Sequence, residues 1–138
     1  MIRAATPAEL PFIRETCCKV RWPRPWMGEG HAVSWDAWLR EHGPVVDRWL
    51  RDGDALVFCQ DDVPDLVLGF SVVTHGQLMC LYVKRDFRGH GIGRALVDGT
   101  GVLYGQQLLC YRPTSSLRHW ARHHGFELVE SIEQVVAA

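Results

Sequence analysis

The chain has 138 residues, of which 47% are apolar and 22% are charged, as is usual for a globular protein. Its 15 Lys and Arg residues and 16 Asp and Glu residues leave a formal net charge of −1, which disfavours a dedicated nucleic-acid-binding protein. No apolar run approaches the roughly 20 residues that span a bilayer, and the N-terminus lacks the apolar core of a secretory signal. We therefore expect one domain, residues 1–138, in a cytoplasmic protein that does not contact a membrane.

Five cysteines, an odd count, are spread along the chain without a Cys-x-x-Cys pair. Three of them lie in apolar, strand-like runs, where a free thiol behaves as a small buried apolar group. This usage disfavours a zinc site and fits a reducing compartment.

The first third of the chain predicts one strand and two helices. A strand at residues 2–5 is followed by Thr6, which is expected to cap a helix whose capping box is completed by Glu9. Ser34 is expected to cap the second helix. The pair Gly43-Pro44 is expected to break that helix, after which its apolar spacing resumes.

The rest of the chain predicts strands and helices in alternation. In order, these are strands at 55–59, 66–74 and 77–83, a helix at 91–102, a strand at 108–111, a helix at 114–125 and a last strand region at 126–136. The whole order, β-α-α-β-β-β-α-β-α-β, predicts an α/β fold with a mixed, mostly antiparallel sheet and helices on both faces. The C-terminal edge of this sheet is expected to be short, which is compatible with a homodimer.

The most informative motif is the glycine-rich run Arg-Gly-His-Gly-Ile-Gly at residues 88–93, which follows an apolar strand and opens a helix. Glycines let the backbone approach a ligand closely, and free N–H groups at a helix start point toward anionic oxygens. Arg88 and Arg94 add positive charge there. The run predicts a phosphate- or pyrophosphate-binding loop, and a capping turn without a ligand is the alternative.

Two common phosphate-binding motifs do not fit this run. A P-loop requires a Lys followed by Ser or Thr, and no such pair occurs in the chain. A dinucleotide fingerprint requires a small residue three positions after Gly91, where Arg94 stands, and it belongs near the start of a larger domain. The pattern that remains is Arg-x-x-Gly-x-Gly.

Residues 83–96, Val-Lys-Arg-Asp-Phe-Arg-Gly-His-Gly-Ile-Gly-Arg-Ala-Leu, resemble the acyl-CoA pyrophosphate loop of the GCN5-related N-acetyltransferases, the GNAT family. Residues 68–73 resemble the family's third strand, and residues 119–128 its closing helix and Gly-Phe turn. The likeness spans essentially the whole chain. It implies a GNAT-like fold and transfer of an acyl group from acyl-CoA to an amine, with acetyl-CoA as the expected donor and no metal.

In that family the pantetheine arm of CoA lies between two splayed strands, and the resemblance implies which residues contact it. The arm is expected to pair with backbone groups of Leu81, Tyr82 and Val83. The pyrophosphate is expected on the amides of seven consecutive residues: Arg88, Gly89, His90, Gly91, Ile92, Gly93 and Arg94. One strand amide would also donate to the thioester carbonyl as negative charge develops on it.

The acid that protonates the departing thiolate is not evident from the sequence. When the chain is aligned on Gly125-Phe126, the family's frequent helix tyrosine falls at Ala121, which has no proton to donate. Tyr111, Tyr104 or an ordered water molecule are the alternatives. A thiolate with a pKa near 8.5 does not strictly need an acid.

Two residues are candidates for the general base. His75 precedes the strand at 77–83 and has an ordinary pKa near neutrality, and a solvated turn histidine is the alternative interpretation. Glu29 lies where the family's substrate-covering segment would be, and a solvated loop carboxylate is the alternative.

His119 and His123 are four residues apart on a predicted helix, but no third ligand follows at motif spacing, so we expect no metal site.

Five of the six tryptophans lie between residues 22 and 49. One interpretation is an aromatic acceptor site built from Trp22, Trp26 and Trp35 beside two arginines, Arg21 and Arg24. The alternative is that the helical tryptophans pack their helices on the sheet: Trp35, Trp38 and Trp49.

These observations leave three functions open. The first is an acyl-CoA-dependent N-acyltransferase that acts directly on an amine of a small molecule or peptide. The second is a non-catalytic acyl-CoA-binding module, which Ala121 and the unplaced base favour. The third is an acyltransferase acting on a nucleobase or nucleic acid, which the Trp and Arg residues suggest and the near-neutral charge disfavours.

Overall fold

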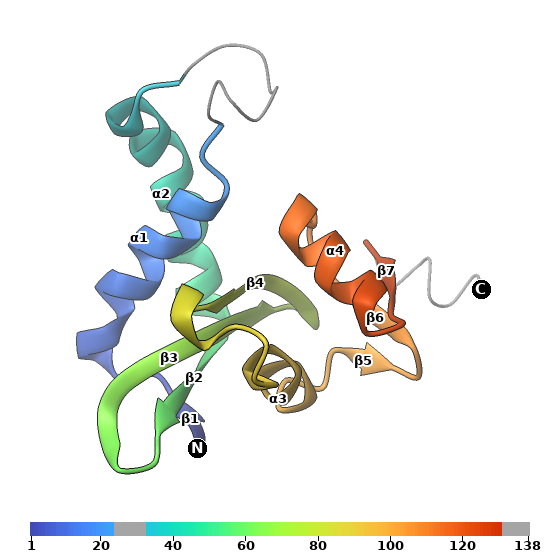
Figure 1. Cartoon of the computed structure of the whole chain (residues 1–138). Helices are drawn as coiled ribbons and strands as arrows, with labels where there is room; N and C mark the ends of the chain where they lie inside the picture. The colour runs from blue at the N-terminus through green and yellow to red at the C-terminus, as the bar shows by residue number, and fades with distance from the viewer. Residues whose placement is uncertain (24–32, 131–138) are drawn as a thin grey trace.

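The computed structural model describes residues 1–23 and 33–130, which form an α/β fold built on two sheets (Figure 1). The first sheet has the order β1-β2-β3-β4 and the second the order β5-β6-β7. The strands are β1 (Ile2–Ala4), β2 (Asp54–Gln60), β3 (Val63–Thr74), β4 (Gln77–Val83), β5 (Leu103–Tyr104), β6 (Gln107–Leu109) and β7 (Glu127–Val129). The helices are α1 (Leu10–Val20), α2 (Trp35–Asp52), α3 (Ile92–Asp98) and α4 (Ser115–His123), with 3-10 turns η1 (Pro7–Glu9) and η3 (Arg85–Phe87).

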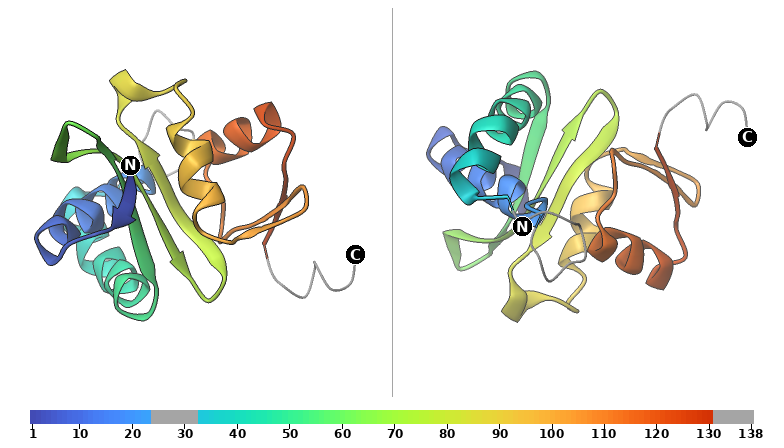
Figure 2. Two further views of the ribbon diagram at one scale, coloured as in Figure 1. Left: turned by 90° about the horizontal axis from the view of Figure 1, so that it is seen from below. Right: turned by 90° about the horizontal axis from the view of Figure 1, so that it is seen from above.

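The predicted fold class is confirmed, because every pair is antiparallel except β6 with β7, and helices lie on both sides of the first sheet (Figure 2). The side chains of β2 alternate between the two faces. Val57 and Cys59 pack in the core formed with α1 and α2, whereas Leu56 and Phe58 pack in the cluster that includes α3. The strand is apolar on both faces because both faces are covered.

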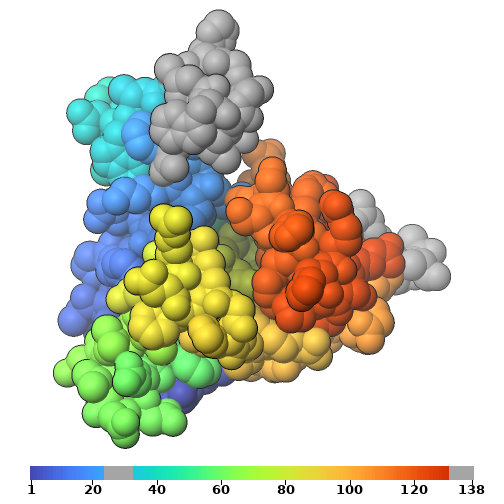
Figure 3. Space-filling view, in the orientation of Figure 1, coloured from blue at the N-terminus to red at the C-terminus, as the bar shows by residue number. Residues whose placement is uncertain are grey.

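The two sheets meet at a single parallel bridge between Leu78 and Cys110, where the Tyr111 N–H donates to the Leu78 carbonyl at 3.0 Å. Beyond this bridge, no strand in the described part of the chain pairs with the outer edge of β4. The space-filling view shows β4 at the bottom of a hollow between the yellow segment that precedes α3 and the orange-red α4 (Figure 3). We call this opening the seam, with residues 79–83 on one side and residues 111–115 on the other.

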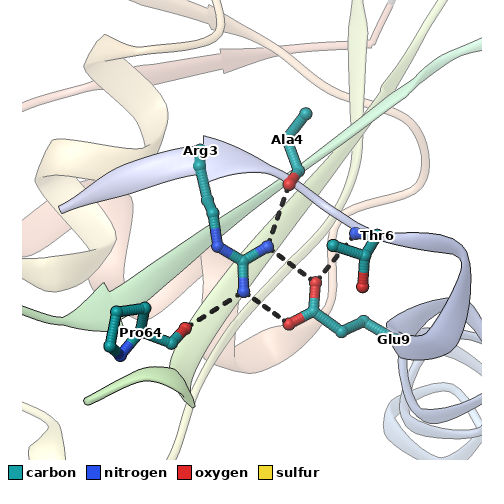
Figure 4. Close-up of polar contacts among 5 residues, drawn as sticks. All are labelled: Arg3, Ala4, Thr6, Glu9 and Pro64. Atoms are coloured by element: carbon teal, nitrogen blue, oxygen red, sulfur yellow. Dashed lines mark hydrogen bonds and ion pairs between the residues drawn. The ribbon is translucent and has the colours of Figure 1, made fainter.

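An ion pair fixes the N-terminal strand to the start of α1 (Figure 4). The Arg3 guanidinium donates to both carboxylate oxygens of Glu9, at 2.8 and 2.7 Å, and to the Pro64 carbonyl at 3.1 Å. Glu9 also accepts the Thr6 N–H at 2.8 Å, which is the part of the predicted capping box that this carboxylate makes. The hydrogen bonds from Arg3 hold the pKa of Glu9 at about 2, below its usual 4.5.

Helix α2 runs without interruption through Pro44, so the predicted break at Gly43-Pro44 is wrong. Ser34 caps this helix as expected. A proline inside a helix removes one hydrogen bond and costs about 3 kcal/mol. Val46 and Trp49, one turn further on, are buried against the sheet, and burial of two large side chains contributes a similar free energy. Tertiary packing therefore decides the local structure here.

Other boundaries differ from the prediction by a few residues. β4 has the predicted bounds, whereas β3 begins at Val63, three residues early, and the two-residue strand β5 was not predicted. α3 ends at Asp98 because glycines follow it, including Gly101 in a left-handed conformation. All five cysteines are free and buried, including Cys17 and Cys18 of α1, whereas burial was predicted only for the three in strand-like runs. Within the described ranges, no helix is both long and apolar enough to cross a membrane.

Candidate functional site

Beyond the bridge, no described strand pairs with the edge of β4 that faces the seam. On its other edge, Leu81, Tyr82 and Val83 pair with β3 in register with Ser71, Phe70 and Gly69. Since neighbouring peptide groups in a strand point to opposite edges, some N–H and C=O groups of residues 81–83 point into the seam. The structure therefore places the three residues predicted to pair with a pantetheine arm along an open strand edge.

A β-bulge lies at the closed end of the seam. Val72 pairs with Cys80 and Val73 with Leu78, so Met79 is an extra residue on β4. A bulge re-aims the backbone groups beside it. The carbonyl of Met79 accepts a hydrogen bond of 2.6 Å from the Arg21 guanidinium.

Arg21, at the end of α1, connects both sides of the seam. Besides Met79 on β4, its guanidinium donates to the carbonyls of Tyr111 at 3.2 Å and Arg112 at 2.8 Å. Its guanidinium carbon lies 5.5 Å from the ring centre of Trp49 and 5.9 Å from that of Tyr111. Sequence analysis named Arg21 only as a neighbour of the proposed acceptor tryptophans. Its contacts across the seam were missed because hydrogen bonds to backbone carbonyls cannot be inferred from sequence.

The glycine-rich run, residues 88–94, follows the open end of β4 and is called the glycine loop below. Gly89 and Gly91 both have φ of 82°, a left-handed conformation that favours glycine. No atom lies within 4 Å of where a Cβ would stand on either residue, so both face open space. The first hydrogen bond of α3 runs from the Ala95 N–H to the Gly91 carbonyl, which leaves the N–H groups just before Ala95 outside the helical ladder.

Side chains of the glycine loop take different positions. Arg88 donates to the Val83 carbonyl at 2.9 Å, so its positive charge lies at the end of β4, and His90 is exposed. Ile92 is buried in the cluster of α3, and the position of a Cβ on Gly93 would be only 3.1 Å from the Trp120 indole nitrogen of α4. The absence of a side chain at Gly93 thus serves helix packing.

Arg94, predicted to face the pyrophosphate, has other contacts. Its guanidinium is 3.0 Å from the carboxylate of Asp98, one turn along α3, and lies 4.8 Å from the centre of the Phe126 ring. Arg88 is therefore the arginine whose contacts place it beside β4, whereas Arg94 joins α3 to the turn after α4.

Of the two predicted bases, the structure describes only His75. His75 is exposed in the turn between β3 and β4, with φ of 54°, at the end of β4 where the bulge at Met79 also lies. This position agrees with the alternative interpretation of a turn histidine. Glu29 lies outside the described residues.

A half-buried histidine that sequence analysis did not single out, His42, lies near Arg21. His42 stacks on Trp38 at 4.5 Å between ring centres and meets the edge of Trp49 at 5.7 Å. Burial, with a smaller effect of the Arg21 charge, lowers the pKa of His42, so the ring is neutral at pH 7. Its Nε2 is buried from solvent and has no hydrogen-bond partner among the described residues. This nitrogen is therefore not accessible to an acceptor amine in this conformation.

The groups considered as proton donors also differ in position. Ala121, where the family tyrosine aligns, is 1% exposed and packs with Leu78 and Cys110. Tyr104 is exposed on β5, whereas Tyr111 is half-buried beside Trp49 at the seam. Tyr111 is thus the predicted alternative that the structure places closest to the opening.

The cysteine at the bridge, Cys110, is fully buried. Burial raises the pKa of the Cys110 thiol to about 11, so it is protonated at neutral pH. Burial also raises the pKa of Cys18. Thiolate attack, and with it a covalent acyl-enzyme on Cys110, is therefore disfavoured at the seam.

The tryptophans mostly pack the helices. Trp49 is in the main core, Trp35 packs against it, and the Trp38 indole donates to the Cys18 carbonyl at 2.8 Å. Trp22 lies 5.2 Å from Trp35 between ring centres, so two of the three proposed acceptor tryptophans are neighbours. Trp26 and Arg24 are outside the described residues.

His119 and His123 are exposed, and over residues 1–23 and 33–130 no three potential metal ligands gather.

The sequence of the chain matches one family model. The model describes the acetyltransferase (GNAT) family and matches residues 12–99, more than half of the chain. The chain belongs to the GNAT family. A search of curated proteins finds no match. The GNAT match includes β4, the glycine loop and α3, and it ends before α4, which carries Ala121.

Solved structures share the GNAT fold at low sequence identity. A Pyrococcus furiosus protein assigned as an acetyl transferase is 14% identical, with a TM-score of 0.53 over 93% of this chain and 78% of that one. A Staphylococcus aureus subsp. aureus protein assigned as a GNAT family acetyltransferase is 12% identical, with a TM-score of 0.50 over 94% and 98%. GNAT membership implies acyl transfer from acyl-CoA to an amine, and the family generally uses acetyl-CoA.

Proposed function

We propose that this chain is a single-domain N-acyltransferase that moves the acetyl group of acetyl-CoA to the amine of a small-molecule or peptide acceptor. The observation that supports it most directly is the open edge of β4, which runs from the bulge at Met79 to the glycine loop. One strand edge thus offers backbone groups for an extended arm and leads to a turn whose last amides lie outside the hydrogen-bond ladder of α3. Family membership supplies the reaction class.

In this proposal the pantetheine arm lies along residues 81–83 and the pyrophosphate lies on the glycine loop. Gly89 and Gly91 allow the phosphates to approach the backbone, since neither has a neighbouring atom on its open side. Arg88 provides the positive charge beside them. The acyl group would then reach the bulge at Met79, where a strand amide stabilises the oxyanion.

The acceptor amine attacks the thioester carbon directly. The new C–N bond forms, the C–S bond breaks, and its electron pair leaves on the CoA sulfur. The ammonium group of the acceptor loses two protons overall, one to solvent and one to the thiolate, which gives the amide, CoA thiol and one proton. Solvent water in the seam can take the first proton, and much of the rate would come from positioning the two substrates.

A non-catalytic acyl-CoA-binding module is the second candidate function. The observation that favours it is the alanine at position 121, which leaves the aligned position of the family tyrosine without a proton donor. Binding of acetyl-CoA without release of CoA thiol in the presence of any amine would support this alternative.

Calorimetric titration with acetyl-CoA tests the CoA site. We expect one molecule to bind per chain, and Gly91→Val to weaken binding at least about tenfold, about 1.4 kcal/mol, because the side chain would fill the open side of the loop. Gly101→Val is the matched control, since Gly101 also has a left-handed φ and open space but lies outside the site. Equal affinity in the two folded variants would reject the proposed loop.

A further inference from the structure

A cavity of about 230 Å³ lies between the end of α1 and the start of α4. Three of the residues that line it come from the end of α1 and its exit, and five come from the segment that leads into α4 and from the start of α4 itself. They are Val20, Arg21, Trp22, Arg112, Pro113, Thr114, Ser115 and Arg118. No residue of the glycine loop lines this cavity, which therefore forms a place distinct from the proposed pyrophosphate site.

The cavity is strongly basic. Three arginines line it, and no Asp or Glu is among the lining residues within 1–23 and 33–130. The Arg21 guanidinium donates hydrogen bonds to three carbonyl groups, and no carboxylate of the described residues is bonded to it. Arg118 lies 3.6 Å from Glu130, but both side chains are 53% exposed, so a ligand can displace this contact at little cost.

Polar groups and size further define the ligand. The hydroxyl-bearing residues Thr114 and Ser115, the N-cap and first residue of the nine-residue α4, line the same wall as Arg112. The positive end of the helix dipole adds to the attraction for an anion. Drug-sized ligands occupy pockets of about 300–1,000 Å³, so a cavity of 230 Å³ suits the charged end of a small molecule.

The cavity adjoins the place where the acyl group is expected. Arg21 lines the cavity, and the same guanidinium donates to the Met79 carbonyl at the bulge of β4. We infer that the cavity binds a carboxylate or phosphate group of the acceptor, so that the acceptor carries both an amine and an acidic group. This inference rests on the proposed function, because it assigns the acceptor side of the same reaction.

Matched acceptor pairs test the inference in an assay that measures CoA thiol release. The pairs are free amino acids against their carboxamides, and 2-aminoethyl phosphate against ethanolamine. We expect at least about tenfold higher kcat/KM for the anionic member of one or both pairs, the effect of one charge-assisted hydrogen bond. The double variant Arg112→Ala/Arg118→Ala should remove this preference, while Arg48→Ala, an exposed arginine of α2, should retain it.

CoA is the other source of a phosphate, and a binding experiment distinguishes it. The double variant should bind CoA and dephospho-CoA as the unsubstituted chain does, and its thermal unfolding shows whether it folds. A loss of affinity for CoA that is absent for dephospho-CoA assigns the cavity to the 3′-phosphate and overturns the inference.

The remaining outcomes separate the inference from the proposed function. Binding of acetyl-CoA with preference for neutral amines, or with no turnover of any anionic amine, overturns the inference and leaves the CoA site intact. Absence of acetyl-CoA binding to the unsubstituted chain rejects both.

Discussion

The two sheets of the molecule are built differently. In the first, β3 has 12 residues and β2 and β4 have seven each, whereas no strand of the second is longer than three. Among the described residues, the strand pairing between them is one bridge, between Leu78 and Cys110. The sheet with the longer strands thus forms one side of the seam, and the sheet with the short strands, together with α4, forms the other. We call these two parts the first unit and the second unit. Local stability follows such differences in pairing and burial, so we expect the second unit to open first.

The largest expected effect comes from truncating a core side chain in each unit. Phe70 and Leu108 are both fully buried, in the main core and in the cluster of the second sheet respectively. Phe70→Ala should lower the free energy of unfolding by about 3–5 kcal/mol and destabilise the whole chain in urea. Leu108→Ala should mainly release the second unit, so hydrogen exchange should show loss of protection in β6 and β7 before β3. Equal loss in β3 and β6 would contradict the division into two units.

A smaller effect is expected at the outer edge of the first unit. Glu9 has a pKa of about 2 when folded and 4.5 otherwise, so its pairing with Arg3 stabilises the fold above pH 4.5 and is lost as pH falls toward 2. Relative to Glu9→Gln, the unsubstituted chain should lose about 1–2 kcal/mol of unfolding free energy across this window. The measurement is chemical denaturation at several pH values. Glu15→Gln, at an exposed position on α1, is the control and should leave the profile unchanged.

The smallest expected effect concerns the contact between α3 and α4. A Cβ on Gly93 would stand 3.1 Å from the Trp120 indole nitrogen, whereas one on Gly99 would meet only ordinary contacts at 3.5 Å. Gly93→Ala should therefore cost about 1 kcal/mol in thermal unfolding, even though alanine favours helices. Gly99→Ala, at the other end of α3, should be neutral or slightly stabilising. Identical effects of the two substitutions would show that α4 is not packed on Gly93.

Sequence patterns predicted the first unit better than the second, for physical reasons. β4 was bounded correctly because a glycine turn precedes it and the glycine loop follows it. The helix break at Pro44 was wrong because burial of Trp49 is a tertiary effect that local propensity does not contain. β5 has two residues, too few for any alternation to be visible.

The candidate site was predictable only in part. The glycine loop was evident because left-handed turns require glycine, and Gly89 and Gly91 have that conformation. The roles of its members could not be separated, since only the packing of α4 shows that Gly93 faces Trp120. The cavity at Arg112 and Arg118 was not evident either, because it forms where segments about 90 residues apart in sequence meet Arg21.

The contacts of Arg21 have a consequence for how the two units are held together. Guanidinium groups do not titrate in proteins, and carbonyl oxygens do not either, so the width of the seam is insensitive to pH across the range where the chain is folded. A connection of this kind responds instead to competition. An anion that draws the Arg21 guanidinium away from the Met79 carbonyl would break the connection that Arg21 makes between β4 and residues 111–112. Arrival of an acidic substrate and widening of the opening would then be one event.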